Sequence, residues 1–190
     1  MTQHTVPVAA LHRRDFLKLS AGSAALLSAG AFTATLSGCA RNEPPAAGYQ
    51  FLRAADLALF TALAPAVLGS TLPLEGRAGH IERVLKGVDA TAYRTLLPTQ
   101  KALYQLFDLL NSGLTRRLST GVSKPWDMAE PEQVQAFLTR WQGSSIGLFN
   151  GGYRALTKFI TGAWVGTDAG LKAAGYPGPF QPMFDVVNAA

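Results

Sequence analysis

Cysteine is almost absent from this chain of 190 residues, which contains a single one, Cys39. One thiol cannot form an internal disulfide, a CxxC redox pair, a CxxCH haem attachment site or a cysteine-rich zinc or iron–sulfur site. Covalently attached haem and cluster-type electron carriers are therefore excluded for this chain. Charged residues are also scarce, at 15% of the sequence against 48% hydrophobic residues. This balance excludes both a charge-rich disordered polymer and a protein that spans a membrane many times, and it predicts one globular domain.

Residues that would carry catalysis are also few. The sequence contains neither G-x-x-x-x-G-K-[ST] nor G-x-G-x-x-G, the fingerprints of phosphate-binding and dinucleotide-binding loops, so we expect no cofactor to bind this chain unaided. Residues 143–147 match the nucleophile elbow G-x-S-x-G around Ser145, but an elbow follows a β-strand and precedes its histidine, whereas His80 precedes the serine. His80 with Glu82 and Asp89 is a weak candidate for a metal site, because zinc needs three or four convergent ligands. We therefore predict a turn between helices at Ser145 and no catalytic or metal site.

The N-terminal region has the pattern of an export signal, in which basic and apolar residues precede an uncharged stretch over 19–38. The motif residues are Arg13, Arg14, Phe16, Leu17 and Lys18. This pattern resembles the signal of the twin-arginine translocation (Tat) route, which exports folded proteins across the cytoplasmic membrane. A nucleic-acid-binding arm is the alternative, but three cations followed by a long uncharged stretch contact phosphate poorly. We expect residues 1–38 to be a cleavable Tat signal peptide.

The signal ends at the only cysteine of the chain. The residues there resemble a lipobox, the cleavage site at which a cysteine is acylated and becomes the new N-terminus: Leu36, Ser37, Gly38 and Cys39. Ordinary cleavage and an uncleaved anchor are the alternatives, and the many Ser, Gly and Thr residues of the stretch disfavour the anchor. A diacylated or triacylated cysteine holds a protein firmly on a membrane. We therefore expect residues 39–50 to be the lipidated cysteine and a flexible tether, and the mature chain to be a membrane-tethered lipoprotein in the periplasm.

The remainder, residues 51–190, has helical periodicity, with apolar residues recurring at spacings of three and four. We expect helices over about 51–66, 81–88, 92–118, 130–141 and 144–164, with ends at Gly69 and Pro73, around Gly87 and at Gly166, and a break near Pro98. No alternating run of β-branched residues is present, so the predicted fold class is all-α, an irregular bundle of about five helices.

Three of these helices have well-marked apolar faces. The predicted core positions are Leu96, Leu103, Leu106, Phe107, Leu110 and Leu114 in the third helix, Val134, Phe137, Leu138 and Trp141 in the fourth, and Ile146, Phe149, Tyr153, Leu156, Ile160 and Trp164 in the fifth. After the last helix the chain continues as a tail rich in proline, glycine and aromatic residues. Because such a tail is poorly accommodated in water, we expect it to cover either its own core or a partner.

The signal, the opening helix from Phe51 and the terminal sequence Gly-Tyr-Pro-Gly-Pro at 175–179 together resemble the gluconate 2-dehydrogenase subunit 3 family. The resemblance implies a non-catalytic small subunit that binds a large FAD-containing dehydrogenase of the glucose–methanol–choline (GMC) type, exports it and helps it to mature. It also implies that a cytochrome c subunit, which carries haem c, commonly takes the electrons. The lipobox goes beyond the usual pattern, because many members of the family are simply cleaved.

From this resemblance we predict that the C-terminal region contacts the flavoprotein. The predicted interface residues are Trp164, Tyr176, Pro177, Gly178, Pro179 and Phe180. Each tryptophan taken alone is more typical of a core than of an interface. The alternative to the subunit is a stand-alone periplasmic lipoprotein that acts as a scaffold or binding module, and an enzyme in its own right is the third reading.

Overall fold

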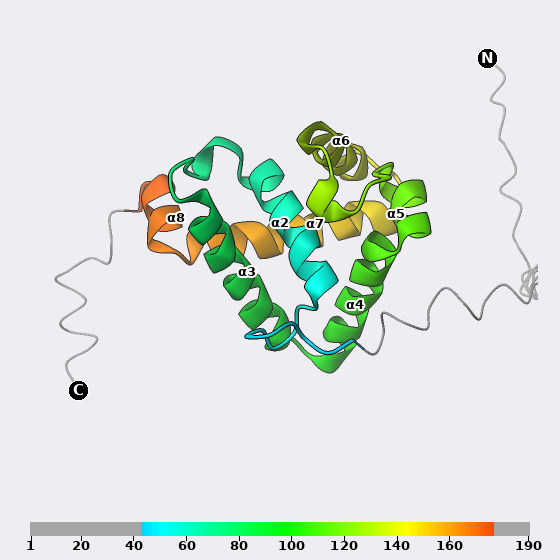
Figure 1. The fold of residues 1–190 in the computed structure, drawn as a ribbon, viewed down its shortest axis with the longest axis horizontal. Helices are drawn as coiled ribbons and strands as arrows, with labels where there is room; N and C mark the ends of the chain where they lie inside the picture. The colour runs from blue at the N-terminus through cyan, green and yellow to red at the C-terminus, as the bar shows by residue number, and fades with distance from the viewer. Residues whose placement is uncertain (1–42, 177–190) are drawn as a thin grey trace, which may run out of the picture. The chain divides into compact units, whose positions relative to one another are not determined.

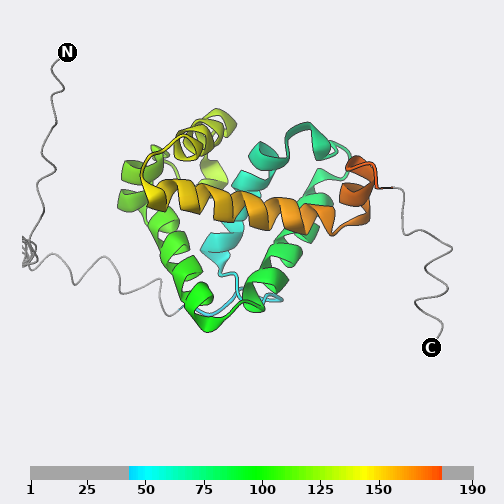
Figure 2. The same ribbon diagram turned by 180° about the vertical axis from the view of Figure 1, so that it is seen from behind.

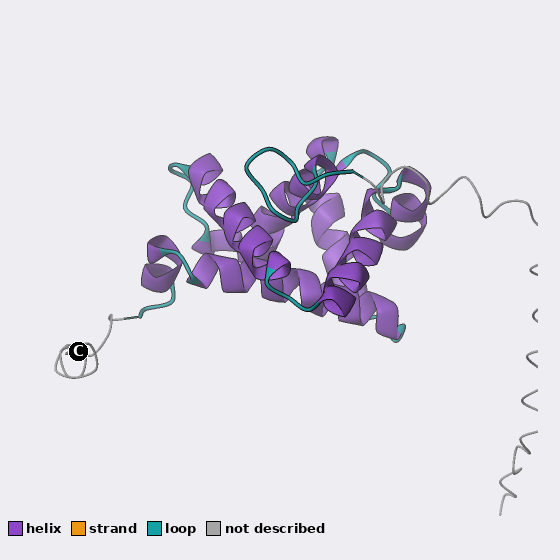
Figure 3. Cartoon of the chain, turned by 90° about the horizontal axis from the view of Figure 1, so that it is seen from below, coloured by secondary structure: helices purple, strands orange, loops and turns teal. Residues whose placement is uncertain are grey.

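The structure, a computed structural model, describes residues 43–176, and Figures 1, 2 and 3 show that these residues form helices joined by loops, without a β-strand. The helices are α2 (Ala54–Leu68), α3 (Arg77–Tyr93), α4 (Leu97–Asn111), α5 (Gly113–Thr120), α6 (Pro131–Gln142), α7 (Gly147–Val165) and α8 (Asp168–Ala173), with 3₁₀ turns η2 (Gly69–Thr71) and η3 (Trp126–Met128). The prediction of an all-α domain is confirmed. The described residues contain seven α-helices rather than about five.

Helix α2 is the central element of the domain. It contacts α3, α4, α6, α7 and η3, and its residues Leu59, Phe60 and Leu63 are fully buried. It ends at Gly69, as predicted, where a φ of 54° favours glycine. Among the described residues, Ala54–Thr71 is the one helical stretch long and apolar enough to cross a membrane, with a mean hydropathy of 1.4. A core helix passes the same test, and these five neighbours identify α2 as such a helix.

Helices α3 and α7 form the most extensive helix pair of the described domain (Figure 2). The predicted end around Gly87 is wrong, because α3 continues to Tyr93. The glycine serves a close approach instead: a Cβ atom placed on Gly87 would lie 2.8 Å from Cβ of Ala163 in α7 and 3.2 Å from its Cα. Gly87 is thus a packing residue and not a helix stop.

Replacing Gly87 by alanine should therefore destabilise the domain, by about 1 kcal/mol or more, because overpacking outweighs the gain in helix propensity. Gly79, in the same helix, has no atom within 4 Å of its built Cβ. Gly79→Ala is the matched control, and we expect it to stabilise the domain slightly. Urea unfolding of both variants measures the difference, and equal shifts of the two midpoints would contradict the assigned contact.

The segment predicted as a helix over 92–118 with a break near Pro98 is three pieces. The predicted break is confirmed, because α3 ends at Tyr93 and α4 begins at Leu97, so that Pro98 lies in the first turn of α4, where its missing N–H is not needed. A second break, which was not predicted, falls at Ser112. The predicted apolar face is correct at its centre and wrong at both ends. Leu103, Phe107 and Leu110 are buried, Leu106 is half-buried, and Leu96 and Leu114 are exposed.

Helices α6 and α7 follow the predicted periodicity more closely. All four predicted core residues of α6 are buried: Val134, Phe137, Leu138 and Trp141. In the C-terminal half of α7 the predicted core residues Leu156, Ile160 and Trp164 are buried. Phe149 and Tyr153 are partly buried, and Ile146, which precedes the helix, is exposed. Gly166 follows the last residue of α7, as predicted, and the short helix α8 is an element that the periodicity did not indicate.

Candidate functional site

The segment before α2 is held by one buried carboxylate of α3. Asp89 accepts three backbone hydrogen bonds: Oδ2 lies 2.9 Å from the nitrogen of Gln50, and Oδ1 lies 2.8 Å from the nitrogens of both Phe51 and Leu52. We call this arrangement the Asp89 clamp. The carboxylate of Asp89 thus provides hydrogen-bond acceptors for three successive backbone amides that would otherwise lack partners in the fold.

Further contacts hold the residues that precede the clamp. Lys86 donates to the carbonyl of Gly48 at 2.6 Å and lies 3.8 Å from the ring centre of Tyr49. The nitrogen of Ala46 donates to the carbonyl of Leu52 at 2.8 Å, which closes a loop. Within the tether predicted for 39–50, residues 46–50 are therefore held by hydrogen bonds to the following residues and to α3. The lipobox and residues up to 42 lie outside the described residues.

A second buried network begins at Arg53, the residue before α2. Its Nε lies 2.8 Å from Oδ2 of Asp56, and its Nη1 lies 2.7 Å from Oδ1 of Asp108 in α4. Asp56 is fully buried and also accepts from the backbone nitrogen of Arg53 and from Nδ2 of Asn111. Burial acts to lower the pKa of Arg53, but the hydrogen bonds and charges of the two carboxylates outweigh it, so the net pKa is raised. Arg53 is thus a permanent cation that links the start of α2 to α4.

Tyr104 of α4 joins the two networks. Its hydroxyl donates to the carbonyl of Phe51 at 2.9 Å, and its ring stacks on that of Phe51 with centroids 4.3 Å apart. The guanidinium carbon of Arg53 lies 4.9 Å from the centre of the Tyr104 ring, within range of a cation–π contact. Burial raises the pKa of Tyr104, which keeps the phenol neutral and donating. These groups are bonded to one another, so the network fixes structure rather than presenting a reactive group.

The positions considered for catalysis are dispersed. Ser145 is exposed in the turn between α6 and α7, as predicted. His80 packs edge-on against Trp164, with ring centroids 5.7 Å apart, while the carboxylate of Asp89 accepts the backbone hydrogen bonds of the clamp. In the part of the chain that the structure describes, no three His, Cys, Asp or Glu side chains are grouped to hold a metal ion.

An open groove of about 560 Å³ lies between α2, η3 and the start of α6. Its apolar lining comes from Ala58, Ala62, Pro65, Ala66, Trp126, Ala129, Pro131 and Val134. Trp126 is fixed in place, because its Nε1 donates to the carbonyl of Leu110 at 2.9 Å. The charged side chains that line the groove are Asp127 and Glu132, both exposed and both acidic. The groove therefore has an apolar floor and an anionic rim.

No protein-family model, curated protein or solved structure matches this chain. The sequence motifs and the geometry of the described domain are therefore the basis of its proposed function.

The predicted interface residues differ in where the structure places them. Trp164 is buried at the end of α7 and is not available to a partner, whereas Tyr176 is exposed. Pro177, Gly178, Pro179, Phe180 and the Tat motif lie outside the described residues.

Sequence reasoning missed the Asp89 clamp, the Arg53 network and the groove. In the sequence, Asp89 was considered only as part of a metal site with His80 and Glu82. The clamp joins residues 37 to 39 positions apart, and the Arg53–Asp108 pair joins residues 55 apart. The local signal that was available is an acid three residues after Arg53, which is the spacing of a capping interaction.

Proposed function

We propose that this chain is the non-catalytic small subunit of a periplasmic FAD-dependent dehydrogenase of the GMC type. In this role it carries the flavoprotein through the Tat route, supports its maturation and attaches it to the membrane through an acylated Cys39. A cytochrome c subunit with haem c would accept the electrons. The observation that carries the proposal is the twin-arginine signal on a small domain, because the Tat route exports folded proteins and one signal can serve a bound partner.

The described domain supports the proposal by offering a docking surface. We place the flavoprotein contact on the groove between α2, η3 and α6. Because its floor is made of alanine, proline and tryptophan and its rim of Asp127 and Glu132, it suits a partner segment with aliphatic side chains and flanking cations. Tyr176 is a second exposed contact in the same proposal.

Purification of the tagged chain from membranes tests the proposal directly. We expect a larger protein with the absorption spectrum of bound FAD to co-purify in a fixed ratio, and the mixture to reduce an artificial electron acceptor with a sugar or alcohol. A chain that is exported and purified alone, without flavin, would favour the stand-alone lipoprotein instead.

Filling the groove should weaken the complex. Ala62 of α2 lies in the groove, and we expect Ala62→Phe to reduce affinity for the flavoprotein roughly tenfold or more, because the ring occupies the space of a partner side chain. Ala102→Phe, at an exposed position on α4, is the matched control. Titration of the purified flavoprotein measures both affinities, and thermal unfolding shows that the variants are folded. Equal affinities for the two variants would move the docking surface elsewhere.

A further inference from the structure

The turn between α3 and α4 exposes three large apolar side chains within five residues. Tyr93, Leu96 and Leu97 are 52%, 78% and 70% exposed. We call these three residues the α3–α4 tip. The turn itself is well bonded, because Nε2 of Gln100 donates to the carbonyls of Tyr93 and Thr95 at 2.7 and 3.1 Å. The apolar residues are thus presented by a fixed turn.

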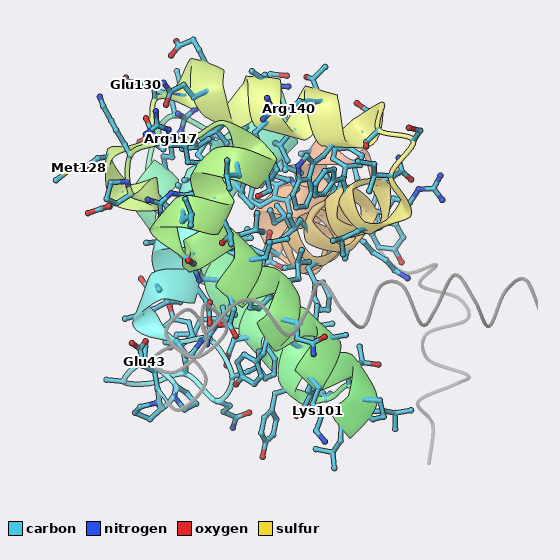
Figure 4. All side chains as sticks on the ribbon, turned by 90° about the vertical axis from the view of Figure 1, so that its right-hand side faces the viewer. Glu43, Lys101, Arg117, Met128, Glu130 and Arg140 are labelled. Atoms are coloured by element: carbon cyan, nitrogen blue, oxygen red, sulfur yellow. The ribbon has the colours of Figure 1, made fainter. Side chains whose placement is uncertain are left out.

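The tip lies at the end of the domain where the described chain begins. Figures 1 and 2 both show the blue N-terminal segment beside the turn that joins α3 to α4. The Asp89 clamp explains the proximity, because Asp89 lies in the last turns of α3, close to Tyr93 in sequence. Figure 4 shows Glu43 and Lys101 toward one end of the domain and Glu130 toward the other.

The length of chain before this segment limits how far the tip can lie from Cys39. Four peptide units separate Cys39 from Glu43, and an extended chain spans at most about 3.6 Å per residue, or roughly 14 Å in all. An acylated Cys39 lies at the membrane surface. Because the clamp and the bonds of residues 46–52 fix the chain from Ala46 onward, an acylated Cys39 would keep the N-terminal end of the domain close to that surface.

The charge of the tip also suits a membrane. Residues 93–101 contain two cations, Arg94 and Lys101, and no acid, and both cations are exposed. The described acid nearest the start of the chain is the exposed Glu43. Tyrosine and leucine beside cationic side chains are typical of segments that lie in the headgroup region of an anionic bilayer, and each cation contributes about 1 kcal/mol there.

We propose that the α3–α4 tip binds the surface of an anionic bilayer, with Leu96 and Leu97 in the headgroup region, and so orients the domain on the membrane. The inference rests on the proposed function in one respect: the acylated Cys39 holds the tip close to the membrane. It adds a second, non-covalent membrane contact. The groove lies among α2, η3 and α6, so this orientation leaves it free for the flavoprotein.

A tryptophan reporter tests the tip. Leu96→Trp and Leu118→Trp are matched, because both leucines are 78% exposed and Leu118 lies on α5, at the other end of α4 (Figure 1). The three native tryptophans are buried and give a common background. Each full-length variant is expressed, recovered from membranes after processing and reconstituted in vesicles of phosphatidylglycerol and phosphatidylethanolamine with brominated acyl chains. Mass analysis of the N-terminal peptide reports acylation separately.

We expect the fluorescence of Trp at position 96 to shift to the blue. Its quenching should be at least about twice that of Trp at position 118, because interfacial residues lie about 5–10 Å deep, within reach of the bromines. Arg94→Glu with Lys101→Glu should reduce this quenching. Equal quenching of acylated Leu96→Trp and Leu118→Trp would overturn the inference. The same result is expected if the tip binds a protein instead of the bilayer, and it overturns the inference in that case too. If Cys39 is unmodified, the proposed anchor fails, and selective quenching of unacylated Leu96→Trp by added vesicles would still establish the tip.

Discussion

Asp89→Ala should lower the free energy of unfolding by about 3 kcal/mol or more. Three backbone amides lose one charged acceptor, and hydrogen bonds to charged groups contribute about 1.5–3 kcal/mol each. The loss should be concentrated at the N-terminal end of the domain. Urea unfolding measures the global effect, and hydrogen exchange of the amides of residues 50–52 measures the local one, which should become much faster.

Two variants make the test specific. Asp89→Asn keeps an oxygen that can accept from the same amides, so we expect a smaller loss than for alanine. Glu75→Ala removes an exposed carboxylate from the loop before α3 and should change stability by less than about 0.5 kcal/mol. Asp89→Ala with unchanged exchange at 50–52 would show that the clamp does not hold the segment.

The largest functional effect is expected from the signal. Arg13→Lys together with Arg14→Lys should leave the precursor in the cytoplasm and retain the flavoprotein with it, because the arginine pair is the residue-specific part of a Tat signal. Cell fractionation, with flavin fluorescence as a marker of the partner, measures both proteins. The substitution keeps the charge, so a simple loss of positive charge does not explain the result.

Arg41→Lys provides the control for this export test, because it makes the same exchange just beyond the predicted cleavage site. We expect it to be exported normally. Periplasmic delivery of both proteins in the double variant would remove the argument for Tat export. Retention of this chain alone, with the flavoprotein still exported, would remove the role as a carrier and leave the signal intact.

Local patterns in the sequence were sufficient for the fold class and for the core positions at the centre of α4, in α6 and in the C-terminal half of α7. Spacings of three and four predicted all of the buried residues of α6, because the apolar residues of an amphipathic helix lie on the face that packs against the core. The errors fall at helix ends. Leu96 and Leu114 continue the periodicity of α4 beyond Leu97–Asn111, so they share the pattern without sharing the core. Gly87 was misread because a glycine that permits close packing and one that ends a helix look alike in one sequence.

The candidate sites were less predictable, because they depend on groups far apart in the chain. Nothing around Asp89 indicates that its partners are the amides of residues 50–52, since a backbone donor leaves no trace in the residue types. The groove is formed by small side chains of α2 beside η3 and α6, and small residues carry a weak signal of their surroundings. The motifs in 1–42 are different, because each is defined by residues that are adjacent in the sequence and not by contacts between distant residues.

The long separations within the two N-terminal networks also bear on the order in which the protein acquires its structure during synthesis. The carbonyl of Phe51 accepts from Tyr104, and the carboxylate of Asp56 accepts from Asn111, so neither set of hydrogen bonds is complete before α4 has been synthesised. A ribosome-bound chain that ends before α4 therefore contains the Arg53–Asp56 pair without its α4 partners Asp108 and Asn111. The segment nearest the signal is synthesised early, but its hydrogen bonds are completed only after α4 has been made. Their completion therefore marks the packing of α4 against the start of α2.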